Sequence, residues 1–102
     1  MSEETCEGLS LEWTQKAEIE WERILTFYTV RNGLRTYSLK LDKELKKILA
    51  STCRSPKRGL KTKRRGVRRC SVARRFAVFY RIKKDAVEVV AVVDARRNIP
   101  LD

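Results

Sequence analysis

The sequence has no histidine and only three cysteines among its 102 residues. The cysteines, Cys6, Cys53 and Cys70, are odd in number and stand at unrelated spacings. The common zinc sites and Cys/His catalytic pairs therefore lack the residues that they need. We expect reduced thiols without a catalytic role, no metal site and no cofactor.

Long apolar runs are also missing. No stretch comes near the roughly 18 consecutive apolar residues that a membrane-spanning helix requires. The chain begins with acidic residues, whereas a signal peptide begins with basic and then apolar ones. These features predict a cytoplasmic protein with no membrane partner. The length allows one core and is too short for two, so a single domain is expected.

Acidic residues are scarce over most of the chain. The formal net charge is +11, and residues 1–22 hold seven carboxylates against Lys16 alone, so the rest of the protein is more basic than the total suggests. Residues 54–75 contain eleven Lys or Arg and no Asp or Glu. Such a concentration of one charge favours a polyanionic partner or an acidic protein surface.

The first half of the chain predicts a strand and two helices. Residues 1–8 are expected to form a flexible acidic arm, which leaves 9–102 as the domain. Residues 9–13 alternate between apolar and polar, as in a half-buried strand. Thr14 is a suitable N-cap, and Asn32-Gly33 a suitable helix end. Two apolar stripes at helical spacing indicate an antiparallel helical hairpin: Ala17, Trp21, Ile24, Leu25 and Tyr28, then Leu34, Tyr37, Leu41, Leu45, Ile48 and Leu49.

The second half predicts three strands after a basic loop. The period changes to two over residues 68–72 and 76–82, and residues 86–93 are almost continuously apolar and β-branched. The last segment is expected to be a central strand covered on both faces. The predicted fold class is α+β: a strand, an antiparallel helical hairpin on one face of the sheet, then a three-stranded antiparallel meander.

The order of these elements resembles the RelE/ParE superfamily of bacterial toxins over about residues 9–100. The segments that carry the resemblance are Arg31-Asn32-Gly33, Tyr37-Ser38-Leu39-Lys40-Leu41, the loop from Pro56 to Gly59, the strand from Phe76 to Ile82, and the stretch from Val93 to Pro100. The resemblance implies the toxin of a type II toxin–antitoxin module, which inhibits growth and is neutralised by a cognate antitoxin. Members either cut messenger RNA on the ribosome or bind DNA gyrase.

The residues match the nuclease branch only in part. The resemblance places Arg68 at the first of two strand lysines, Cys70 at the second, and Ala77 at an arginine of the third strand. Arg97 matches the arginine after the last strand, but the chain ends before a C-terminal Tyr or His could enter the site. Cleavage through the 2′-hydroxyl needs a proton acceptor, a proton donor and cations on the phosphate. Tyr80 could exchange protons, although its strand face predicts a core position.

The incomplete pattern favours a ParE-like gyrase poison, which needs a binding surface and no catalytic group. Two alternatives remain: a RelE-type ribosome-dependent mRNA endonuclease, and a basic nucleic-acid-binding module or inactive homologue. The candidates for catalysis are Arg68, Arg97, Lys61 and Lys63, and those for binding nucleic acid or the target are Arg68, Arg81, Arg96 and Arg97. The antitoxin is expected to cover the basic sheet face and a groove by the helices with acidic and apolar groups.

Overall fold

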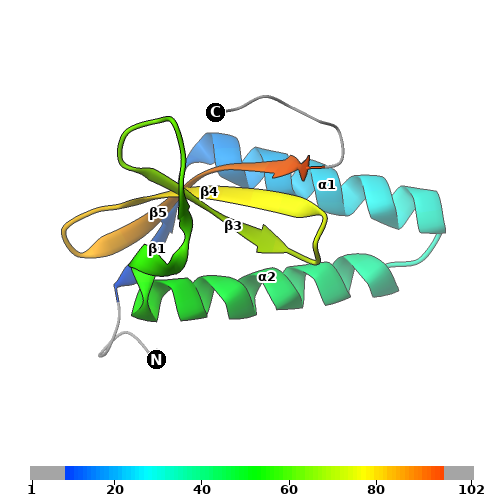
Figure 1. Cartoon of the computed structure of the whole chain (residues 1–102). Helices are drawn as coiled ribbons and strands as arrows, with labels where there is room; N and C mark the ends of the chain where they lie inside the picture. Colours follow the sequence, from blue (N-terminus) through cyan, green and yellow to red (C-terminus); the bar gives the residue numbers. More distant parts are fainter. Residues whose placement is uncertain (1–8, 96–102) are drawn as a thin grey trace.

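A computed structural model describes residues 9–95 of the chain. Its elements, in chain order, are β1 (Ser10–Trp13), α1 (Gln15–Asn32), α2 (Thr36–Arg54), the 3-10 turn η2 (Pro56–Arg58), β2 (Leu60–Lys61), β3 (Val67–Val72), β4 (Phe76–Ile82) and β5 (Ala86–Asp94). The α+β class and the order of strand, helical hairpin and meander are confirmed (Figure 1). The predicted arm, residues 1–8, lies outside the described residues, as do Arg96 and Arg97.

The helical hairpin begins and ends where local chemistry predicts. The Thr14 hydroxyl accepts a hydrogen bond from the Ala17 N–H at 3.1 Å, which caps α1. Gly33 closes α1 with a φ of +71°, a left-handed conformation that glycine adopts without steric cost. Leu34 was expected in the second stripe, but it lies in the connection between the helices and is 67% exposed.

Polar contacts join the two helices. The indole N–H of Trp21 donates to the Asp42 carboxylate at 2.9 Å. The Ser38 hydroxyl donates to the Leu25 carbonyl at 2.9 Å and lies 2.6 Å from the Thr29 hydroxyl. These bonds satisfy polar groups between helices that otherwise meet through apolar side chains, so they fix the register of the hairpin.

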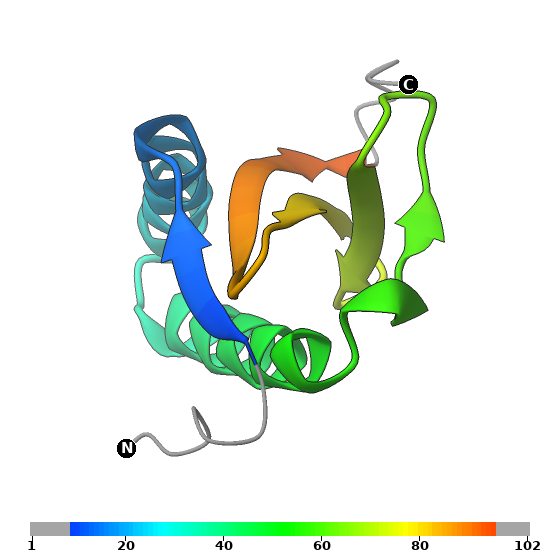
Figure 2. The ribbon, with the colours of Figure 1, turned by 90° about the vertical axis from the view of Figure 1, so that its left-hand side faces the viewer.

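The sheet has five strands in the order β1-β5-β4-β3-β2. β1 runs parallel to β5, and the other pairs are antiparallel. Figure 2 shows α2 beneath the sheet and α1 beside β5, while no helix of the described residues lies on the opposite face of the sheet. We call this face the open face. Trp21, Tyr28, Leu45, Phe76 and Val89 belong to the main core, which lies between the helices and the sheet.

Two expectations for the last strand are wrong. β5 is an interior strand but not the central one, a position that β4 occupies. Within residues 9–95 no helix covers its second face, and a β-bulge explains its continuous apolar run. Tyr80 pairs with Val89 and Phe79 pairs with Ala91, so Val90 has no partner on β4. The extra residue reverses the alternation of side chains, so apolar residues are needed on both faces.

Candidate functional site

The most basic part of the molecule folds as a hairpin, with η2 and β2 on one side and β3 on the other. We call residues 57–69 the basic hairpin. It contains Lys61, Lys63 and Arg68 from the sequence-based candidates. β2 pairs with β3 over only two positions, Leu60 with Arg69 and Lys61 with Arg68. In Figure 1 its loop projects from the sheet on the side opposite α2, so its tip is free of the helices.

Tyr80 attaches the basic hairpin to the core. The side chain is fully buried, and its hydroxyl donates to the Pro56 carbonyl at 2.6 Å while it accepts the Gly59 N–H at 3.1 Å. Gly59 is required at this contact because a Cβ there would overlap the Tyr80 hydroxyl. Burial raises the pKa of Tyr80 above its ordinary value, against the opposing effect of the Gly59 N–H. The core position expected for Tyr80 is what the structure shows.

Arg68 holds the same loop from the next strand. Its guanidinium donates to the Gly59 carbonyl at 2.8 Å and to the Lys57 carbonyl at 3.2 Å. Arg68 faces the same side of the sheet as Tyr80, its partner on β4. Both side chains therefore position the backbone of residues 56–59.

The other candidate cations divide between two places. Lys61 on β2 and Lys63 in the loop are exposed, and both belong to the basic hairpin. Arg81 is exposed on β4 between Val67 and Glu88, and a regular strand places it on the open face, away from Arg68. The structure thus brings Lys61, Lys63 and Arg68 together but does not place Arg81 with them on one face.

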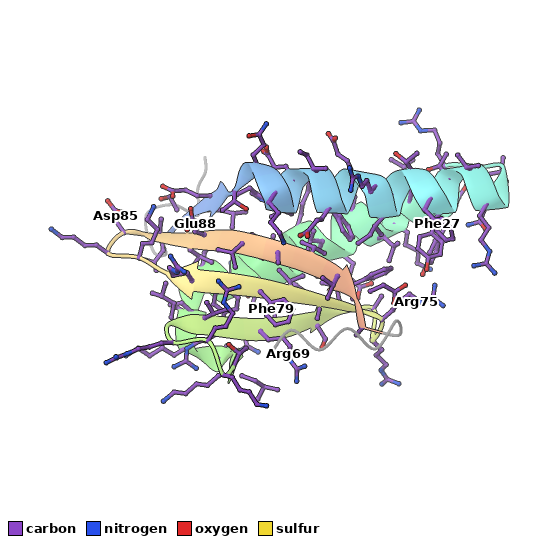
Figure 3. All side chains as sticks on the ribbon, turned by 90° about the horizontal axis from the view of Figure 1, so that it is seen from above. Phe27, Arg69, Arg75, Phe79, Asp85 and Glu88 are labelled. Atoms are coloured by element: carbon purple, nitrogen blue, oxygen red, sulfur yellow. The ribbon has the colours of Figure 1, made fainter. Side chains whose placement is uncertain are left out.

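The sequence reasoning did not single out Arg69, although it borders the centre of the open face. Arg69 pairs with Phe79 on β4, and Figure 3 looks onto the face where the two are labelled. Phe79 belongs to a small second cluster with Val67, Ala77 and Ala91. Period-2 alternation from Val67 could have identified Arg69, but the resemblance directed attention to Arg68.

Ala77 and Cys70 stand where the nuclease branch of the family has an arginine and a lysine, and neither replaces the missing cation. Ala77 is 5% exposed within the second cluster. Burial raises the pKa of the Cys70 thiol, and it also raises that of Cys53, so both thiols are protonated at neutral pH. Neither position supplies a cation or a proton acceptor that an RNA phosphate could reach.

A groove of about 500 Å³ lies between α1 and the end of β5. Its apolar lining includes Ile24, Phe27, Tyr28, Phe76 and Val93. β1 pairs with β5 only from Ala86 to Val89, and within residues 9–95 no other strand pairs with this edge of β5. There the Glu20 carboxylate accepts the Val92 N–H at 2.9 Å. The Thr14 hydroxyl also donates to the Val90 carbonyl, at 3.5 Å, so the groove combines an apolar floor with a sheet edge that these two side chains cover.

Arg75 lies near the end of this groove. Its guanidinium is 5.4 Å from the centre of the Tyr28 ring and donates to the Tyr28 hydroxyl at 3.0 Å. Figure 3 shows Arg75 and Phe27 at the same end of the molecule. Within residues 9–95, no group of three or more His, Cys, Asp or Glu side chains is placed to hold a metal ion. No helix in that range is long and apolar enough to cross a membrane.

The element order and the sheet topology define the α+β fold of RelE/ParE-like toxins. A structure of the chromosomal ParDE toxin–antitoxin system from Pseudomonas aeruginosa superposes with a TM-score of 0.73 at 22% identity, covering 86% of this chain and 97% of that one. A solution structure of the conserved hypothetical protein HP0894 from Helicobacter pylori gives a TM-score of 0.47 at 17% identity, over 86% of this chain and 96% of that one.

A crystal structure of TrmO from Pseudomonas aeruginosa gives a TM-score of 0.46 at 15% identity, covering 84% of this chain and 35% of that one. No curated protein matches the sequence. Residues 11–99 match the family model of the ParE toxin of the type II toxin–antitoxin system, parDE. The chain belongs to this family of ParE toxins, and such a family implies a cognate antitoxin.

Proposed function

We propose that the protein is a toxin that poisons DNA gyrase by binding to it, and that a cognate antitoxin neutralises it. The observation that supports this most directly is the use of Arg68 and Tyr80. The Arg68 guanidinium and the Tyr80 hydroxyl form hydrogen bonds with the backbone of residues 56–59. A ribonuclease needs such groups free to take up and deliver protons at the scissile phosphate.

The environment of the remaining positions supports the same proposal. General acid–base groups and phosphate-binding cations each contribute about 10²-fold or more to such a reaction. Ala77 and the protonated Cys70 contribute neither effect. A toxin that acts by binding needs neither effect, because it requires only a surface that fits its target.

Gyrase inhibition can be measured directly with purified components. Relaxed plasmid, gyrase and ATP are incubated with increasing toxin, and supercoiling and double-strand cleavage are read from gels. We expect loss of supercoiling with accumulation of linear DNA, and its reversal when the antitoxin is added first. Unchanged supercoiling, together with cleavage of messenger RNA on translating ribosomes, would establish the nuclease alternative instead.

We also propose that the groove between α1 and β5 receives a segment of the antitoxin. Its floor is apolar, and Val92 offers a backbone N–H that a Glu20 carboxylate now occupies. An extended segment that continues the line of β1 along β5 would bond this edge and bury apolar side chains beneath it. Arg23 also lines the groove, where an acidic side chain of the segment would find a cation.

A pair of substitutions tests this docking site. Phe27 lines the groove and is 45% exposed, whereas Leu34 is 67% exposed in the helix connection outside it. With each variant expressed beside the antitoxin, we expect Phe27→Asp to weaken the complex at least about tenfold and Leu34→Asp to leave it intact. Equal affinity of the Phe27→Asp variant and the unaltered toxin would exclude the groove.

A further inference from the structure

We infer that the basic hairpin is a binding site for the phosphate backbone of duplex DNA. The site is separate from any surface that contacts gyrase itself. The choice of DNA as the source of the phosphates rests on the proposed function, since gyrase works on a DNA segment that a bound toxin could also touch.

The hairpin has a high density of cations without carboxylates to pair with. Residues 45–84 contain sixteen Lys or Arg and no Asp or Glu. Within the described part of the chain, no ion pair joins a cation of the hairpin to a carboxylate. Six of the hairpin's cations are exposed: Lys57, Arg58, Lys61, Lys63, Arg64 and Arg65. When these cations neutralise DNA phosphates, their mutual repulsion is relieved and the counterions condensed on the DNA are released.

The backbone that carries these cations is held in one shape. Tyr80 and Arg68 fix residues 56–59 from below. Across the loop, the Thr62 hydroxyl donates to the Val67 carbonyl at 2.9 Å, and the Thr62 N–H donates to the same oxygen at 3.2 Å. Binding therefore costs less conformational entropy than it would for a flexible basic loop.

The composition of the hairpin favours a nucleic acid over an acidic protein. A stable protein interface has an apolar or aromatic centre that loses water. Among the hairpin residues, Leu60 is the one large apolar side chain that is exposed. Interfaces with nucleic acids are instead polar and strongly positive.

The hairpin also lacks what binding to single strands requires. Proteins that hold single-stranded nucleic acid stack its bases on exposed aromatic rings. Residues 57–69 contain no Phe, Tyr or Trp, and Phe79 on the neighbouring strand is 6% exposed. The cations can therefore contact phosphates but have no aromatic surface beside them for bases. This pattern suits the regular backbone of a duplex, bound without preference for sequence.

The test measures binding of the full-length toxin to a short fluorescent duplex DNA by anisotropy, in the absence of gyrase. One variant combines Lys61→Ala, Lys63→Ala and Arg65→Ala. The control combines Lys40→Ala, Lys43→Ala and Lys47→Ala, which removes the same charge from exposed positions of α2. Thermal unfolding within about 2 °C of the unaltered protein establishes that both variants are folded.

We expect the hairpin variant to bind at least tenfold more weakly than the control variant at about 100 mM salt. Each neutralised phosphate contributes about 0.9 units to the slope of log affinity against log salt, so this slope should fall by about 2 to 3 units. Equal losses for both variants would overturn the inference, because they would show only the general effect of net charge.

Other ligands distinguish the source of the phosphates. Weaker binding of duplex RNA and of single-stranded DNA supports the assignment to duplex DNA, and equal or tighter binding of either overturns it. Loss of antitoxin affinity in the hairpin variant without loss of DNA affinity would also overturn it, in favour of an acidic protein.

The supercoiling assay separates this inference from the proposed function. DNA binding through the hairpin without gyrase inhibition would refute the proposed function and leave the phosphate site standing. Gyrase inhibition by a toxin that does not bind DNA would refute the phosphate site and leave the proposed function standing.

Discussion

Tyr80 is the residue on which the shape of the basic hairpin depends most. Its hydroxyl bonds two backbone groups 21 and 24 residues earlier in the sequence. The ring is fully buried, and its two backbone partners at Pro56 and Gly59 are half-buried. A single phenol thus links the core of the sheet to the segment that carries the exposed cations.

Replacement of this hydroxyl has a predictable cost. Tyr80→Phe removes the hydrogen bonds to the half-buried Pro56 carbonyl and Gly59 N–H. Each such bond contributes about 0.5–1.5 kcal/mol, so the two together contribute about 1–3 kcal/mol. We expect a loss in this range in the free energy of unfolding measured with urea. Tyr37→Phe is the matched control, because the Tyr37 hydroxyl takes part in one long bond of 3.4 Å, from Arg75. Equal losses for the two variants would contradict this role of Tyr80.

Tyr80 also makes the stability of the protein depend on pH in the alkaline range. The pKa of Tyr80 is raised above its ordinary value of 10.0, first by burial. Its contribution to stability is therefore complete below the unfolded pKa of about 10 and is lost as the pH rises through the folded pKa. The unaltered protein should lose stability more steeply than Tyr80→Phe as the pH rises above about 10 in urea unfolding. The raised pKa values of Cys53 and Cys70 affect both proteins alike, so parallel curves would refute the prediction.

At the scale of elements, two glutamates connect the helices to strand ends. Glu20 of α1 accepts the Val92 N–H, and Glu44 of α2 accepts the Ala73 N–H at 3.1 Å. Each carboxylate occupies a backbone donor that no neighbouring strand reaches. Hydrogen bonds to charged acceptors are stronger than neutral ones, so these contacts fix where each helix lies along the sheet.

The turn between β3 and β4 is strained by its sequence. Ala73 and Arg74 have φ values of 55° and 56°, a region that is favourable for glycine and asparagine. The left-handed conformation costs about 1 kcal/mol for other residues. The hydrogen bond that the Ala73 N–H donates to the Glu44 carboxylate helps to hold the turn in place.

Relief of this strain should stabilise the protein. We expect Arg74→Gly to raise the free energy of unfolding by about 0.5–1 kcal/mol, since glycine adopts a positive φ without a clash. The control is Ala50→Gly on an exposed position inside α2, which should lower it by about 1 kcal/mol. Both values come from urea denaturation. A loss of stability in both variants would mean that the turn stores no strain.

At the scale of the whole molecule, charged side chains are distributed unevenly over the surface. Glu20 of α1 lies at the groove and the edge of β5, whereas the basic hairpin projects from the opposite edge of the sheet (Figure 2). The molecule therefore offers two chemically different surfaces. One suits an antitoxin segment that pairs with a strand edge, and the other suits phosphates.

The proposed activity predicts a specific response in a bacterial host. Controlled induction of the toxin should arrest growth and induce the DNA damage response, because a poisoned gyrase leaves broken DNA. Mapping of messenger RNA 5′ ends should find no new cuts inside translated frames. Co-expression of the antitoxin from the neighbouring reading frame is the control and should restore growth. Fresh cuts in translated frames would instead support the nuclease alternative.

The sequence by itself determined the elements and the charge. Apolar spacing predicts α1 and α2, alternation predicts β3 and β4, and Thr14 and Gly33 mark the ends of α1. These features follow from interactions within a few residues of the chain, or from the burial of one face of an element. The excess of basic residues, and with it the preference for an acidic or polyanionic partner, is also a property of the sequence alone.

Only the tertiary structure decided how distant residues are used. Alternation in residues 9–13 does not say that β1 pairs in parallel with β5, and an apolar run does not reveal the bulge at Val90. The sequence makes Arg68 a candidate for catalysis or binding and predicts a core position for Tyr80, but it does not reveal that both bind the backbone of residues 56–59. The reason is that hydrogen-bond partners far apart in the chain are chosen by the packing of whole elements, which local patterns do not encode.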